Sequence, residues 1–445
     1  MSVEADLGPR RRLRGTNHVD AVTWLTVYIV VLYAIPSRLV VGALGSAGSV
    51  SMLFGLASFA VWMLQRVWVW RTRPLRTGPV QAAWWVFVFV AGVSYVMAVS
   101  RPISADELSP LDVSMLVLVS WSGTLLVAHD GVRSRERLET LIWRMALCGG
   151  VLALLGLAQF ATGRTFVDTI SVPGLTSVAA SGTYYRSGLV RPSGTAIHPI
   201  EYGVLITMLL PLALHVAFHH RTRNLFLRCA PALAIGAVIG ASSSRSAYLG
   251  AATGLAICAV GWSARQRRTV LALGLGGAIV LVAAVPRLTR SIVGLFAGAE
   301  EDPSITSRTG SLDMAWWFLS QHPLFGRGLG TFMPKYRIFD NQYLNLLVGV
   351  GVVGTIAFVA LAVVAVVHLI RTFRAVSEPS ARDLTTSLIA AIVTMIVSLA
   401  YFDAFAFPMT MGTLFLLLGL AGASRRILHP GSLSTRAAPT AMIDA

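Results

Sequence analysis

Charged residues are scarce in this chain. Only 13% of the 445 residues are Asp, Glu, Lys or Arg, whereas 55% are hydrophobic. The mean hydropathy is +0.70. A soluble domain carries about a quarter charged residues, so this composition excludes an ordinary soluble enzyme or binding module.

Lysine and cysteine are also rare. Lys335 is the only lysine, so the net charge of +16 comes almost entirely from arginine. The arginines occupy short segments between apolar runs and not one basic soluble face, which argues against a nucleic-acid-binding protein. Cys148, Cys229 and Cys258 fall within or at the ends of apolar runs, so we interpret them as packing residues.

No metal site and no cofactor is predicted, because we find no cluster with the spacing of metal ligands on a helix. The pair His219-His220 is interpreted as part of a basic cytoplasmic surface.

Apolar runs long enough to cross a bilayer recur along the whole chain. Helices need roughly 17–25 residues for this, and the runs lack the alternation of barrel strands. The expected fold class is therefore all-α, a polytopic membrane protein that forms a single integral membrane domain over residues 1–445. We predict about twelve spans, at roughly 20–35, 39–64, 82–99, 111–128, 138–161, 198–218, 225–241, 246–262, 269–286, 341–370, 384–402 and 405–423.

Arginine clusters predict the orientation of these spans. They lie at about 10–14, 66–76, 133–144, 221–228, 265–268, 371–382 and 425–426, all on one side of the predicted topology. The positive-inside rule makes that side cytoplasmic. We therefore expect a multi-pass protein of a bacterial inner (plasma) membrane with both termini in the cytoplasm.

Two long loops lie on the predicted outer side, at about 162–197 and 287–340. Long ordered loops usually carry function. In the second loop, Leu312, Ala315, Trp316 and Leu319 share one helical face, which predicts a short amphipathic helix on the outer membrane surface. A buried loop helix is the alternative.

Three arginines, Arg191, Arg245 and Arg308, fall just outside the membrane, on the side otherwise poor in positive charge. One guanidinium group can donate two parallel hydrogen bonds to the oxygens of a phosphate. The N-termini of spans six, eight and ten are also predicted to point outward, and the partial positive charge there favours an anion. We predict that these arginines bind a diphosphate. Snorkelling to the interface is the alternative for any one of them.

Two nearby motifs carry less information. The run Gly326-Arg327-Gly328-Leu329-Gly330 lacks the Lys-Ser/Thr of a phosphate-binding loop, so we interpret it as a tight turn. Asp106-Glu107 is interpreted as a solvated turn.

Four segments together resemble the O-antigen ligase and polymerase superfamily. They contain Arg191-x-x-Gly194-x-x-x-His198-Pro199, then Ser244-Arg245-Ser246, then Pro323-Leu324-x-Gly326-x-Gly328, and finally Asn341-x-x-Leu344 after the large loop. The resemblance implies a membrane glycosyltransferase of the C-type fold. Its donor would be a sugar chain on undecaprenyl or another polyprenyl diphosphate, its acceptor a glycan or glycolipid, and it would need neither nucleotide sugar nor metal.

One departure from the family pattern concerns the proposed base. The ligases typically carry His-Asn where this chain has Asp340-Asn341, which favours a polymerase or another glycan-transferring relative. A carboxylate can also take a proton from a sugar hydroxyl, so we predict that Asp340 is the catalytic base and that Asn341 orients the acceptor. Capping of the following helix is the alternative role for Asp340. His198 and Glu201 are the next candidates for the base.

The sequence therefore predicts an inverting, metal-independent glycan polymerase or ligase. The alternative is a polytopic transporter or a flippase for lipid-linked sugars, without glycosyl transfer. Asp403, between the last two predicted spans, is the residue that the transporter interpretation would use. A carboxylate within the bundle and accessible from both sides would favour that alternative.

Overall fold

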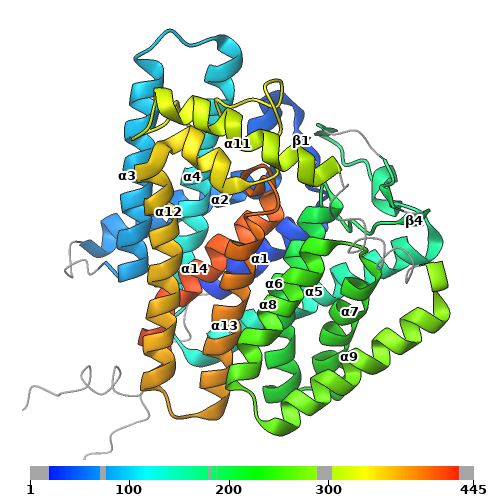
Figure 1. Cartoon of the computed structure of the whole chain (residues 1–445). Coiled ribbons are helices and arrows are strands. Elements are labelled where there is room, and N and C mark those ends of the chain that lie inside the picture. Colours follow the sequence, from blue (N-terminus) through cyan, green and yellow to red (C-terminus); the bar gives the residue numbers. More distant parts are fainter. Residues whose placement is uncertain (1–19, 71–76, 179–181, 187, 288–302, 430–445) are drawn as a thin grey trace, which may run out of the picture.

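The structure, a computed structural model, describes residues 20–70, 77–178, 182–186, 188–287 and 303–429. Both chain termini lie outside these residues, so the predicted cytoplasmic location of the termini remains a prediction. Almost all regular structure in the described residues is helical, and the all-α fold class is confirmed (Figure 1).

Nine of the described helices are long and apolar enough to cross a membrane. They are α2 (Val50–Trp70), α3 (Pro79–Val99), α4 (Ala105–Gly131), α5 (Arg135–Thr162), α6 (Pro199–His219), α9 (Ala264–Ala284), α12 (Gln342–Ala375), α13 (Pro379–Ser398) and α14 (Pro408–Leu428). Three shorter helices occupy the remaining predicted spans: α1 (Ala21–Ala34), α7 (Leu225–Ala241) and α8 (Arg245–Gly261).

The second predicted span, 39–64, begins too early. Residues Leu39–Val41 form strand β1, Gly42–Gly48 form the 3-10 helix η1, and α2 starts only at Val50. Three glycines in η1 disfavour an α-helix there, although the segment is apolar. Strand β1 instead pairs in antiparallel register with β2 (Leu175–Ser177), which places Val40 opposite Thr176.

Helices α6 and α14 lie at the centre of the bundle, each with 83% of its most apolar window buried. Helix α14 packs against α3, α4, α12 and α13, and α6 packs against α5, α7, α8 and α13. In contrast, α9 has no buried residue and diverges from the bundle beside α7 (Figure 1). A helix that is apolar on every side and exposed in the protein suits a lipid environment.

The two long loops contain the remaining elements. The first contains the 3-10 helix η2 (Phe166–Thr169), strand β2 and a small hairpin of β3 (Tyr185–Arg186) and β4 (Leu189–Val190). The second contains α11 (Pro303–Gln321), which crosses the top of the bundle in Figure 1 and packs against α12.

Helix α11 covers the expected amphipathic segment, but the four residues of the predicted face have different environments. Ala315 and Leu319 are buried, whereas Leu312 and Trp316 are 45% and 65% exposed. The buried pair faces protein because Ala315 packs with Phe339 and Val348. The location of α11 on a membrane surface therefore remains a prediction.

Candidate active site

The segment that leads into α6 is fixed by a buried glutamine. Gln159 of α5 accepts hydrogen bonds from the backbone N–H groups of Ser193 (3.1 Å) and Gly194 (2.8 Å), and donates one to the Gly194 carbonyl (3.0 Å). Gly194 has a φ of +56°, a conformation that residues with a side chain rarely adopt. The hydroxyl of Thr195 then donates to the Tyr33 carbonyl at the end of α1 (2.6 Å). These contacts give the start of α6 a fixed position.

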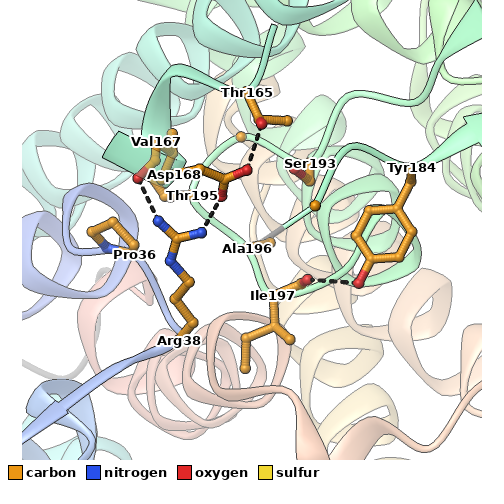
Figure 2. Close-up of a pocket in the computed structure, with 12 residues that line it drawn as sticks. Pro36, Arg38, Thr165, Val167, Asp168, Tyr184, Ser193, Thr195, Ala196 and Ile197 are labelled. Atoms are coloured by element: carbon orange, nitrogen blue, oxygen red, sulfur yellow. Dashed lines mark hydrogen bonds and ion pairs between the residues drawn. The ribbon is translucent and has the colours of Figure 1, made fainter. Parts of the chain in front are cut away.

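A small pocket lies beside this segment, between it, Arg38 and earlier residues of the same loop, among them Thr165 and Tyr184 (Figure 2). Arg38 forms an ion pair with Asp168 and donates to the Val167 carbonyl (2.6 Å). The Tyr184 hydroxyl points to the Ile197 carbonyl at 3.5 Å from the other side. The polar contacts therefore attach the 162–197 loop to the body of the protein next to His198.

His198 is the N-cap of α6, and its Nδ1 accepts a hydrogen bond from the Ile200 N–H (3.1 Å). Burial and the nearby Arg191 guanidinium lower the pKa of His198 to about 4. The imidazole is therefore neutral at physiological pH, and with Nδ1 as acceptor the proton lies on Nε2. This arrangement suits a hydrogen-bond donor better than a general base. The structure thus brings together two of the predicted site residues, Arg191 and His198.

Glu201 is fully buried one turn further along α6. Its Oε2 accepts from the Ile197 N–H (3.0 Å), and its Oε1 accepts from the Met409 N–H in the first turn of α14 (2.8 Å). Met409 lies in the first turn of α14, where backbone N–H groups have no partner within the helix, and Ile197 lies in the loop just before α6. The contacts favour a structural role for Glu201, joining α6 to α14, over a role as a base.

Asn341, and not Asp340, is the N-cap of α12. The Asn341 side chain accepts from the Tyr343 N–H at 2.9 Å. The capping alternative that we considered for Asp340 is therefore wrong, because the neighbouring residue performs that role. Asp340 is partly buried, immediately before the helix.

A second carboxylate, Asp403, lies close to Asp340. Burial, together with the negative charge of Asp340, raises the pKa of Asp403 to about 6, and a hydrogen bond with Asn345 partly opposes this shift. Asp403 precedes the 3-10 helix η3 (Ala404–Ala406), in the loop 399–407 between α13 and α14. Sequence analysis did not associate the two aspartates, which are far apart in the chain.

The loop 399–407 joins the two groups of predicted residues. The Gln342 N–H donates to the Leu399 carbonyl (2.8 Å), and the Gln342 side chain accepts from the Phe405 N–H (2.9 Å). On the other side, the ring of Phe407 lies 6.4 Å from that of His198. The N-termini of α6, α12 and α14 therefore meet around one loop, and their dipoles favour an anion there.

Arg245 is the first residue of α8, which packs against α6 and α13. It follows three buried serines, Ser242 to Ser244. Ser243 has a φ of 46°, the only non-glycine residue with positive φ in the described part of the chain. Such strained backbone often occurs at functional sites, and here it sets the direction in which α8 begins.

Arg308 lies in the first half of α11, but its side chain falls outside the described part of the structure. Its role in binding the diphosphate therefore remains a prediction. Arg191 is partly buried, and its backbone N–H donates to the Tyr184 carbonyl (2.8 Å).

The glycine-rich run 326–330 is a tight turn, as predicted. Gly326, Gly328 and Gly330 all have positive φ. The turn lies against a break in α12 at Gly351, and a Cβ on Gly326 would come within 2.5 Å of the Gly349 backbone. The turn therefore fixes the end of the second long loop against α12.

The interpretation of Asp106-Glu107 as a solvated turn is wrong for Glu107. Helix α4 already begins at Ala105, and Glu107 is buried between Arg101 (3.1 Å) and Arg327. The Tyr336 hydroxyl also donates to it (3.1 Å). Arg101, which lies nearby in the sequence, and Arg327 and Tyr336 of the second long loop compensate this carboxylate. Glu107 therefore attaches the second long loop to α4.

Together these observations define a polytopic helical membrane protein with ionisable groups gathered where several helices begin. Residues 230–359 match the family model described as O-antigen ligase. This match agrees with the resemblance to the O-antigen ligase superfamily that the four sequence segments indicate. It includes Arg245, Arg308, Asp340 and Asn341, whereas Arg191, His198, Glu201 and Asp403 lie outside it. No curated protein matches the chain.

Proposed function

We propose that this protein is a bacterial membrane glycan polymerase or ligase. It transfers a sugar chain from a polyprenyl-diphosphate donor to an acceptor hydroxyl of a glycan or glycolipid, on the outer face of the inner membrane. The family match supports glycosyl transfer and a lipid-linked donor. The observation that carries the reaction is the pair Asp340 and Asp403 beside the N-terminus of α12.

The reaction follows from the chemistry of these side chains. Asp340 takes the proton of the acceptor hydroxyl, whose oxygen attacks the anomeric carbon of the donor. The bond from that carbon to the phosphate oxygen breaks on the opposite face, so the configuration inverts and polyprenyl diphosphate leaves. Asn341 caps α12 and thereby holds Asp340 in place.

The leaving group gains negative charge as the glycosidic bond breaks. Arg191, Arg245 and Arg308 are proposed to bind the diphosphate, and cations placed in advance stabilise that charge most in the transition state. The N-termini of α6 and α12 add partial positive charge. The arginines take the part that a metal ion plays in other phosphate-handling enzymes, so we propose a reaction without a catalytic metal.

The same proposal places loops 162–197 and 287–340 outside and both termini in the cytoplasm. The arginine clusters between spans support this orientation through the positive-inside rule. The whole chain is then one integral membrane domain.

A transporter or flippase is the second candidate, because the twelve spans predicted from the sequence also suit that class. Its expected residue, Asp403, lies in the loop 399–407 beside Asp340 and not within a helix of the bundle. A carboxylate near one end of the bundle suits chemistry at that surface better than ion coupling at mid-membrane.

Deletion of the gene, followed by analysis of surface glycan and lipid-linked intermediates, tests the function. Accumulation of single repeat units on lipid would indicate a polymerase, and accumulation of long chains on lipid would indicate a ligase. Unchanged surface glycan and unchanged lipid-linked pools would contradict both.

A further inference from the structure

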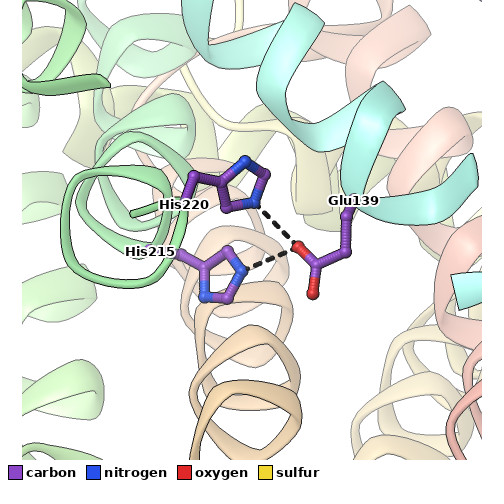
Figure 3. A group of neighbouring side chains, drawn as sticks. All are labelled: Glu139, His215 and His220. Atoms are coloured by element: carbon purple, nitrogen blue, oxygen red, sulfur yellow. Dashed lines mark hydrogen bonds and ion pairs between the residues drawn. The ribbon is translucent and has the colours of Figure 1, made fainter. Parts of the chain in front are cut away.

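We propose that Glu139, His215 and His220 bind one divalent transition-metal ion, zinc by preference (Figure 3). Glu139 lies near the start of α5, His215 near the end of α6, and His220 at the C-cap of α6. The site is therefore at the opposite end of α6 from His198. It is a structural site, independent of the proposed glycosyl transfer.

This cluster corrects the sequence interpretation of the histidines. We treated His219-His220 as basic surface, yet the His220 side chain is only 9% exposed and that of His215 is fully buried. His215 and His219 are also four residues apart on α6, a spacing that places both on one face of a helix. The carboxylates come from α5 and α13, which the spacing along α6 cannot reveal.

The donor atoms are close enough to share an ion. Glu139 Oε2 lies 3.0 Å from His215 Nε2 and 2.9 Å from His220 Nε2, and all three atoms lie within 4.8 Å of one another. Ligands of a tetrahedral zinc ion are roughly 3.3 Å apart, given bonds of about 2.0–2.1 Å. The two distances from Glu139 to the histidines are therefore within a few tenths of an ångström of this spacing, and three protein ligands leave a fourth position for water.

Asp383 of α13 contacts the ring nitrogen of His215 that does not face Glu139. Its Oδ2 lies 2.7 Å from His215 Nδ1, the contact by which metal-bound histidines are commonly oriented. If the Nδ1 proton is donated to Asp383, the Nε2 lone pair of neutral His215 faces the lone pairs of Glu139. Two acceptors at 3.0 Å repel each other unless a cation or a proton lies between them.

A doubly protonated His215 is the competing explanation. It would donate from Nδ1 to Asp383 and from Nε2 to Glu139, and would place an imidazolium ion where no solvent reaches. A metal ion satisfies the same carboxylates, and His220 Nε2, which otherwise donates a hydrogen bond to Glu139, becomes a third ligand. In either case the cluster joins α5, α6 and α13, but only the metal site makes their association depend on zinc.

The test uses the full-length protein, purified in detergent through an affinity tag without histidine. After dialysis against metal-free buffer, bound metal is measured by mass spectrometry and unfolding is followed with and without added Zn²⁺. We expect about one zinc per chain and a higher Tm with zinc. His220→Asn should lose the zinc and the zinc-dependent part of the Tm.

His219→Asn is the matched control, because His219 lies next to His220 but 3.5 Å from Asp383 and outside the Glu139 group. It should keep the zinc. If His220→Asn does not fold, Glu139→Gln and the absorption spectrum of the Co²⁺-substituted wild type provide the same test. A wild type without bound metal, and with a Tm that zinc does not change, would overturn the proposal. Loss of zinc in His219→Asn but not in His220→Asn would also overturn it.

Discussion

Asp340 is the residue on which the proposed reaction depends most. Asn341 already caps α12, so removing the Asp340 charge should leave the helix start intact. Asp340→Asn is therefore expected to fold, reach the membrane and bind donor, while transfer falls by roughly 10²–10⁴-fold. Transfer is measured with lipid-linked donor and purified protein.

Asp313→Asn is the matched control for this substitution, since Asp313 is exposed on α11 and has no place in the proposed site. It should keep the wild-type rate. Full activity in Asp340→Asn would exclude Asp340 as the base.

Asp403 gives the reaction its expected pH dependence. Its pKa is raised to about 6, so it is neutral below that pH and charged above it. The ionised Asp403 attracts the acceptor proton toward the pair of carboxylates, so the rate should rise as pH increases through about 6. Asp403→Asn is neutral at every pH and should lose this rise, as a pH–rate profile would reveal. A mutant profile that still rises near pH 6 would assign the titration to another group.

Arg245 is the arginine for which the structure offers the best test. It begins α8 after a strained serine turn, and it is partly buried. Arg245→Ala should reduce the rate by about a hundredfold or more, and Arg245→Lys should recover only part of it, because lysine lacks the planar fork. Arg268→Ala, on the exposed start of α9, serves as the control. If the wild type, the two Arg245 variants and Arg268→Ala all have the same rate, Arg245 affects only the topology of the chain.

The lengths of the apolar runs predict where most helices lie, but they do not predict which side chains of a helix are buried. The segment 225–241 was predicted with the bounds that α7 has. The start of the second span was wrong because hydropathy does not register the helix-breaking effect of Gly42–Gly48. Similarly, the amphipathic pattern located α11 but not the burial of Ala315, which depends on Phe339 and Val348.

The orientation of these elements can be tested directly. In a background without the native cysteines, Ser320→Cys on α11 should react with an impermeant thiol reagent in intact cells or spheroplasts. Ala264→Cys at the start of α9 should react only after lysis. Both positions are exposed, so accessibility within the protein does not limit labelling. The reverse pattern would invert the topology and with it the proposed location of the site.

At the scale of the whole molecule, the candidate site is assembled from segments that the sequence separates widely. The motifs identified Arg191, His198 and Asp340 individually, and residue chemistry suggested their roles. The sequence could not reveal that loop 399–407 joins the starts of α6 and α12, because this contact depends on how α13 and α14 pack. For the same reason, the sequence alone makes Glu201 a candidate base, because it does not reveal the two backbone N–H groups that the carboxylate accepts from.

We propose that the protein breaks the bond between sugar and diphosphate, whereas a flippase would only move the intact lipid-linked sugar across the membrane. The most direct measurement reconstitutes the purified protein in liposomes with polyprenyl-diphosphate-linked glycan and acceptor, without added divalent cations. We predict that one polyprenyl diphosphate is released for each new glycosidic bond, and that this bond has the inverted configuration. Movement of intact donor between the leaflets, without any release of polyprenyl diphosphate, would contradict it.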